Sequence, residues 1–358
     1  MPSLKEIKGR INSISSTLAI TSAMKMVAAA KLQKAQMAIQ NMLPYERRLH
    51  SMLIDLMGAM NISAAASEDG SVRGSGSAER GFDQSGDRLS LSNRHDLAGM
   101  DGAYSLMAQR EVRKVAIVAF ASNSSLCGAF NSNAIREATA VINEYRASGL
   151  GDADITVYSV GRKMAEAMKK LGFPSPADFT KMSDSPSYDA ASALAQELFD
   201  GFVSGRFDKV ELVYNHYKST SSQPTTRQTY LPLSLADATA DLQAGKITDS
   251  ASETDTNRGA DPVGAPVVRQ GSPTTEDLIV EPSKEALIAT LLPKVIRLRI
   301  FTTLLDSAAA EHAARTVAMQ LATDNGNDLL QELTLEYNKG RQQKITSEIL
   351  DLVGGSMQ

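Results

Sequence analysis

The strongest constraint on the fold is an apolar repeat in the first sixty residues. Steps of three and four residues, taken alternately from Leu4, define a seam that only Thr21, Lys25 and Glu46 interrupt with polar side chains. A repeat sustained over so many heptads predicts a left-handed coiled coil, on the order of 80 Å long, rather than a helix lying on a globule. The apolar seam positions are Leu4, Ile7, Ile11, Ile14, Leu18, Ala28, Leu32, Ala35, Ile39, Met42, Leu49, Leu53, Leu56 and Met60.

A second helical region covers the C-terminal part of the chain, from residue 283 to about residue 354. Two long amphipathic helices at opposite ends of one chain most simply pair in antiparallel orientation. Each Leu or Ile buried between them would stabilise the pair by roughly 1.5 to 3 kcal/mol. The apolar residues of this region are Ile288, Leu291, Val295, Leu298 and Leu305 on one face, with a second run at Ile345, Ile349 and Leu352.

Between the two helical regions the pattern changes to alternating strands and helices. Residues 114–121 (KVAIVAFA) have the continuous apolar character of a buried strand. This order predicts a small α/β domain with a mostly parallel sheet. The other expected strands are 155–160, 209–214 and an edge strand at 227–231, and the expected helices are 133–148, 161–171 and 189–203.

Two segments fit neither part of the chain. Residues 63–103 are rich in Ser, Gly and Asp, and residues 235–275 are rich in Ala, Thr, Asp and Gly, with few large apolar residues in either. Segments of this composition cannot bury enough apolar surface to offset the entropy of ordering them. We therefore interpret both as solvent-exposed insertions, flexible at least in part.

Composition and charge exclude several classes of protein. Aromatic residues make up only 5% of the 358 residues, and the net charge of −4 argues against a nucleic-acid binder. Insertion into a membrane is not expected, because the most apolar helical stretch, residues 286–305, carries Lys294, Arg297 and Arg299. The first sixty residues nevertheless carry eight basic and three acidic side chains, which suits an acidic protein partner.

No catalytic, cofactor or metal site is expected. The Gly-rich residues 149–152 (GLGD) lack the features of a phosphate-binding loop. The single cysteine, Cys127, follows the first strand, where a nucleophile could stand, but no His lies near it in the sequence, and a small buried residue is the simpler interpretation. The four histidines, which lie too far apart for metal ligation, are His50, His95, His216 and His312.

Three motifs resemble one family. Residues 20–36 (ITSAMKMVAAAKLQKAQ) closely resemble the N-terminal helix of the gamma subunit of F-type ATP synthases. Residues 311–319 (EHAARTVAM), 322–326 (ATDNG) and 337–349 (YNKGRQQKITSEI) look like the other signature helix of that family. Residues 125–131 (SLCGAFN) are similar to its Gly-Leu-Cys-Gly-Gly-Leu-Asn turn, with Ser125 and Ala129 as departures. The motifs occur in the family's order, and the resemblance covers everything except the two insertions.

The resemblance implies the fold class and the domains. It implies an α/β plus coiled-coil protein, in which a long antiparallel pair of N- and C-terminal helices carries a central Rossmann-like α/β domain. The division that follows is an N-terminal coiled-coil helix at 1–62, insertions at 63–103 and 235–275, the α/β domain at 104–234, and a C-terminal coiled-coil helix at 276–358.

The resemblance also implies a function without bond chemistry. In this family the gamma subunit is the central rotor shaft inside a hexamer of alpha and beta subunits, and its foot sits on the membrane c-ring beside the epsilon subunit. Flow of protons (or sodium ions) turns the shaft and drives ATP synthesis in the hexamer. The implied location is the cytoplasmic face of the bacterial inner membrane, as a peripheral part of the complex.

Family positions transfer to particular residues of this chain. Met24 and Lys25 match positions near the acidic lever of the beta subunits, with Arg315 opposite them on the C-terminal helix. The apolar tip in the bearing would begin at Ile349. The remaining matches, in the zone that meets a beta-subunit catch loop, are Arg341, Gln342, Thr346 and Glu348.

Other functions remain open at this point. The second insertion follows the segment after which chloroplast gamma subunits carry a redox-regulated loop, but it has no cysteine, so a thiol switch cannot operate there. A small α/β enzyme tethered by a coiled coil is the alternative function, with Cys127 as its candidate nucleophile. A coiled-coil adaptor of a secretion or vacuolar-type motor is disfavoured, because such stalks generally lack an α/β domain between their helices.

Overall fold

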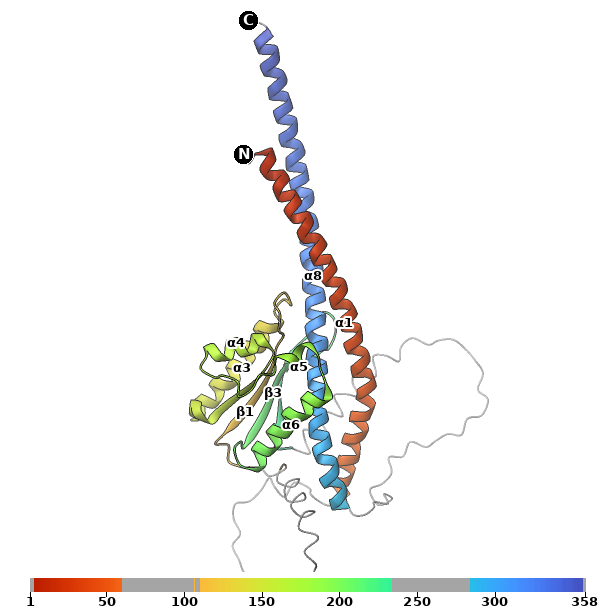
Figure 1. The fold of residues 1–358 in the computed structure, drawn as a ribbon, viewed down its shortest axis with the longest axis vertical. Helices are drawn as coiled ribbons and strands as arrows, with labels where there is room; N and C mark the ends of the chain where they lie inside the picture. The colour runs from red at the N-terminus through yellow and green to blue at the C-terminus, as the bar shows by residue number, and fades with distance from the viewer. Residues whose placement is uncertain (1–2, 60–105, 107–109, 234–283, 357–358) are drawn as a thin grey trace, which may run out of the picture.

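Two long antiparallel helices form the axis of the molecule. The computed structural model describes residues 3–59, 106, 110–233 and 284–356. Helix α1 (Leu4–Ala59) descends from the N-terminus, and helix α8 (Lys284–Ser356) returns beside it and continues beyond it (Figure 1). The fold class expected from the sequence is therefore confirmed. Both expected insertions, 63–103 and 235–275, lie outside the described residues, so the proposed domain limits stay a prediction.

The seam predicted for α1 faces α8. Every seam position from Leu4 to Leu56 is buried or half-buried, including the three polar ones. Ile7, Leu32 and Leu53 are among the buried members, at 3%, 8% and 4% exposure. The alternating three- and four-residue spacing thus marks the face that α1 presents to its partner.

The three polar residues that interrupt the seam all bind α8. Their bonds run from Thr323 Oγ1 to Thr21 Oγ1 (3.1 Å), from Lys25 Nζ to Gln320 Oε1 (2.8 Å) and from Thr302 Oγ1 to Glu46 Oε1 (3.0 Å). An apolar seam alone tolerates sliding by a heptad, whereas specific polar pairs are satisfied in one register only. These bonds therefore fix how far along α8 each residue of α1 lies.

Helix α8 has a matching seam that the apolar pattern did not predict. Two of its members are glycines, and a Cβ placed on Gly326 would lie 2.6 Å from Leu18 Cδ2, while one on Gly340 would lie 3.1 Å from Leu4 Cδ2. Leucines of α1 thus fill the space that the glycines leave. The buried or half-buried positions, again three and four residues apart, are Met319, Thr323, Gly326, Leu330, Leu333, Tyr337 and Gly340.

The central domain is a four-stranded sheet in the order β2-β1-β3-β4. Strands β2, β1 and β3 are parallel, and β4 joins β3 at the edge in antiparallel orientation, as expected. The strand bounds lie within two residues of the predicted ones, because short apolar runs between turns are strong signals. They are β1 (Val115–Phe120), β2 (Ile155–Val160), β3 (Lys209–Asn215) and β4 (Thr225–Leu231).

Helices cover both faces of this sheet (Figure 1). One face packs against α3 (Phe130–Ala147) and α4 (Arg162–Lys170). The other packs against α6 (Tyr188–Val203) and α8, with the short α5 (Thr180–Asp184) beside them. Helix α5 was not predicted, since five residues are too few to show a helical period.

Strand β1 shows why the sequence of a strand in this sheet is a continuous apolar run. Val115, Ile117 and Ala119 enter the core beneath α3 and α4. Ala116, Val118 and Phe120 enter the core shared with α6 and α8. A parallel strand with helices on both faces has no polar side to alternate. The coiled-coil helix α8 is therefore also one of the layers of the α/β domain.

No helix in the described ranges has a segment both long enough and apolar enough to cross a membrane.

The seam glycine Gly326 gives the first prediction. Gly326→Leu should lower the free energy of unfolding by about 1 to 3 kcal/mol relative to Gly9→Leu, because the new side chain displaces Leu18 from the seam. Gly9 is the matched control, since it lies in α1 with nothing within 4 Å of its Cβ position. Thermal unfolding followed by circular dichroism measures both variants, and equal stabilities would contradict the close approach.

Candidate functional site

The residues matched to the family's contacts lie in two zones of the shaft. The lower zone holds Met24 and Lys25 of α1, both half-buried. Lys25 is oriented by a relay, because Gln320 accepts from Lys25 through Oε1 and donates through Nε2 to both carboxylate oxygens of Asp324 (2.8 and 2.9 Å). The surface beside this relay is apolar, since Met26 and Val27 are 63% and 58% exposed.

Arg315 has different neighbours. Its Nη1 donates to Glu311 Oε1 (2.7 Å), and its Nη2 donates to Ser124 Oγ in the loop after β1 (2.7 Å). Its side chain is only 11% exposed. Burial raises the pKa of the Glu311 carboxyl, and the positive charge of Arg315 opposes that shift. Arg315 therefore faces the central domain, whereas Lys25 binds Gln320. No local pattern predicts the contact with Ser124, because the two residues lie 191 positions apart.

The upper zone is the end of α8 that continues past Leu4. Arg341, Gln342, Thr346 and Glu348 are all exposed there. The Thr346 hydroxyl donates to the Gln342 carbonyl (2.9 Å), and Lys344 lies 3.8 Å from the Glu348 carboxylate. These interactions are local to the helix, so the side chains are available to another protein.

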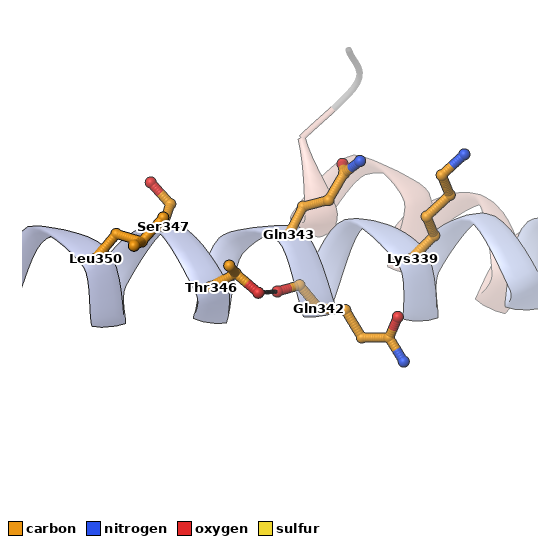
Figure 2. Close-up of a pocket in the computed structure, with 6 residues that line it drawn as sticks. All are labelled: Lys339, Gln342, Gln343, Thr346, Ser347 and Leu350. Atoms are coloured by element: carbon orange, nitrogen blue, oxygen red, sulfur yellow. Dashed lines mark hydrogen bonds between the residues drawn. The ribbon is translucent and has the colours of Figure 1, made fainter.

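A shallow open concavity lies on this upper zone (Figure 2). It is open because a single helix forms its walls, and it therefore cannot enclose a small ligand as catalytic pockets do. Ile345, Ile349 and Leu350 add exposed apolar surface nearby, at 44%, 54% and 64%. Mixed polar and apolar surface of this kind suits contact with a protein. The lining residues are Lys339, Gln342, Gln343, Thr346, Ser347 and Leu350.

The turn around Cys127 is a packing element. Cys127 is 1% exposed, packs with Phe130 against Ala310 of α8, and accepts a hydrogen bond from Asn131 Nδ2 (3.1 Å). Gly128 has φ +58°, and its Cβ position lies 3.7 Å from the Cβ of Ala318. A thiol enclosed in this way cannot reach a substrate, which counts against the tethered enzyme.

A cluster of charges in the central domain is internally satisfied. The buried Glu211 receives hydrogen bonds from Arg227 Nε (2.7 Å) and Tyr145 OH (2.7 Å), and the Lys209 ammonium lies 2.7 Å from it. Burial alone would raise the pKa of Glu211, but these partners outweigh it and lower that pKa. The cluster joins α3 to the edge of the sheet and leaves no carboxylate for chemistry.

The three histidines in the described part of the chain serve packing and docking. Burial lowers the pKa of His50 and of His312 to about 4, with smaller contributions from nearby cations. His216 Nδ1 lies 2.6 Å from Asp306 Oδ2 on α8, and this hydrogen bond raises its pKa. His95 lies outside the described residues. Among the residues that the structure describes, no group of His, Cys, Asp and Glu could hold a metal ion.

Comparison with known proteins gives one consistent result. A family model described as ATP synthase matches residues 3–357. The ATP synthase gamma chains of Phocaeicola vulgatus and Bacteroides thetaiotaomicron are 47% and 44% identical to this chain, with full coverage of both sequences in each case. A chain in the structure of the Euglena gracilis mitochondrial ATP synthase (OSCP, F1 and c-ring) has a similar fold. That chain has a TM-score of 0.52 and 18% identity, with 99% of this chain and 93% of that chain covered.

The enclosed thiol gives the second prediction. Cys127 in the native protein should react with a thiol reagent at least about a hundredfold more slowly than in the unfolded chain, because its sulfur is buried. The matched control is Ser125→Cys in a Cys127→Ala background, which places a thiol on the exposed side of the same turn. Absorbance of the released chromophore measures both rates, and rapid labelling of native Cys127 would revive the tethered enzyme.

Proposed function

This chain belongs to the ATP synthase gamma-chain family, and from that membership we infer how its helix pair works as the central rotor shaft of the enzyme. The shaft itself performs no bond chemistry; catalysis belongs to the complex. The observation that carries the proposal is the helix pair held in a single register, with an exposed end of α8 extending past its partner. A single register lets rotation of one end reach the other without slippage.

The physical role of the shaft is to shift conformational equilibria. The surface of the helix pair is not the same on all sides. Exposed apolar side chains such as Met26 and Val27 lie on α1, so the side that carries them differs chemically from the others. Each orientation of the shaft therefore contacts the surrounding subunits differently. A partner shifts the conformational equilibrium of a protein only when it binds two of its conformations with different affinity. Rotation presents a different side of the shaft to each catalytic subunit in turn, and so favours a different conformation of that subunit.

We assign the partners by position along the shaft. The alpha and beta hexamer surrounds the upper part, the epsilon subunit lies beside the central domain, and the c-ring carries the foot. Proton flow through the membrane sector turns the c-ring and with it this chain. The assembly sits on the cytoplasmic face of the bacterial inner membrane, with this chain as a peripheral member and with no cofactor of its own.

Residues of both zones are the proposed contacts with the hexamer. In the lower zone these are the half-buried Met24 and Lys25, and the relay through Gln320 to Asp324 orients Lys25 beside the apolar Met26. In the upper zone Arg341 offers a planar fork of donors suited to a carboxylate, and Gln342 offers an amide beside it. Thr346 and Glu348 complete this zone, and the apolar residues from Ile349 onward suit a bearing.

Assembly tests the proposed function directly. The chain should have no ATPase activity alone, and mixing it with folded alpha and beta subunits should give a complex of about three alpha, three beta and one copy of this chain. Size-exclusion chromatography with mass measurement reads the stoichiometry, and an ATPase assay reads the activity. Failure to assemble with folded partners would contradict the rotor function.

The upper zone gives a separate prediction. Replacing both Arg341 and Gln342 by Ala should lower ATP synthesis by about tenfold or more, because each lost charge-assisted contact weakens the grip on the hexamer. The helix should remain folded, since both side chains are exposed. ATP synthesis in reconstituted vesicles is the measurement, with Arg136→Ala on the exposed face of α3 as the control. Unchanged synthesis would refute the contact.

A further inference from the structure

The point where α8 leaves the central domain carries a contact with no assigned role. The loop between β1 and α3, residues 121–129, lies against α8 there. Cys127 and Phe130 pack on Ala310, Ser124 accepts from Arg315, and Gly128 lies next to Ala318. The loop therefore follows α8 over about two turns. Beyond Ala318, the contacts of α8 seen among the described residues are with α1.

Ser124 is held firmly in this loop. Its carbonyl accepts from the Ser122 hydroxyl (2.5 Å) and from Asn131 Nδ2 (3.1 Å). The neighbouring Asn123 donates to the Thr180 carbonyl (2.7 Å) and accepts from the Arg162 amide (2.7 Å), which ties the loop to α5 and α4. The backbone of Ser124 is thus fixed by the central domain, and its exposed hydroxyl is carried at a defined place beside α8.

Arg315 depends on that acceptor. Arg315 and Glu311 are only 11% and 10% exposed, so water can solvate neither charge fully. Buried charges are tolerated when all their donors and acceptors have partners, and losing one partner is costly. Glu311 engages Nη1, and Ser124 engages Nη2. Ser124 therefore supplies one of the two hydrogen bonds that hold the guanidinium in place.

This arrangement conflicts with a direct contact between Arg315 and the stator. Both terminal nitrogens of its guanidinium are engaged inside the chain, and little of the side chain reaches the surface. An exposed contact residue would resemble Arg341, which lies free on the upper part of α8. Any influence of Arg315 on rotation must therefore pass through the groups it touches.

We propose that Ser124 and Arg315 are a positioning pair that holds the β1–α3 loop on α8 and fixes the point where the free length of the shaft begins. This proposal rests on the rotor function. The large apolar core between the domain and α8 extends along α8 from Ile288 to Leu304, and a small cluster around Ala310 lies closer to Arg315. Among the described residues, the positioning pair is the polar contact between the domain and α8 that lies nearest to the free shaft, so losing it weakens the hold of the loop and lets α8 twist more independently of the domain.

The test uses Ser124→Ala, Ser124→Thr and Arg315→Lys. In the full chain, Ser124→Ala should speed hydrogen exchange of the loop amides roughly tenfold, since a hydrogen bond to a charged group is lost. In the assembled, membrane-bound complex, it should lower the ratio of protons pumped to ATP hydrolysed by about twofold or more. Ser124→Thr, which keeps the hydroxyl, should restore both readouts, and Ser125→Ala is the matched control.

A double variant separates the two possible roles of Arg315. If the pair acts as one unit, Ser124→Ala combined with Arg315→Lys should lower the ratio no further than Arg315→Lys alone. A normal ratio in Ser124→Ala with a lowered ratio in Arg315→Lys would overturn the proposal in favour of a direct stator contact. Normal ratios in both would overturn it as well. Failure of the wild-type chain to assemble would refute the rotor function instead, and the exchange rates would still decide the loop contact.

Discussion

The register between α1 and α8 is the constraint on which the rest of the structure depends. Apolar side chains supply most of the association energy, but a heptad repeat alone permits several alignments of similar energy. The bonds of Thr21, Lys25 and Glu46 to α8, together with the glycines that receive Leu4 and Leu18, select one of them. The polar seam residues lower the association energy of the helix pair but restrict it to one register. For a shaft, a unique register matters more than a higher association energy.

The same helix connects the coiled coil to the central domain. Between residues 291 and 313, only Lys294 of α8 is exposed, because α1 covers one side while α6 and the sheet cover another. Docking is reinforced by Asp306, which accepts from the Tyr217 amide (2.9 Å) while Tyr217 OH accepts from Gln36 of α1 (2.6 Å). Turning the domain must therefore turn both helices, since neither can move without breaking this shared core.

Local patterns predicted much of this fold, and contacts distant in the sequence explain what they missed. The α1 seam and the strands follow from spacing and apolar character. The α8 seam escaped prediction, because Gly326 and Gly340 contribute space rather than apolar surface. The family match placed Arg315 beside the lower contact zone, but only the fold shows that it binds Ser124, 191 positions away. Contacts with other subunits depend on surfaces that lie outside this chain. Its sequence and structure therefore identify only candidate contact residues, such as Arg341 and Gln342.

The unequal lengths of the two helices have a mechanical consequence. Helix α1 begins at Leu4, opposite Gly340, so the remaining residues of α8 up to Ser356 stand as a single helix about 24 Å long. Two helices bonded to each other resist torsion better than one. The torsional stiffness of the shaft is therefore high near the central domain and low at its tip. Strain from a stalled tip would be stored first in that single helix and released when the surrounding subunits move.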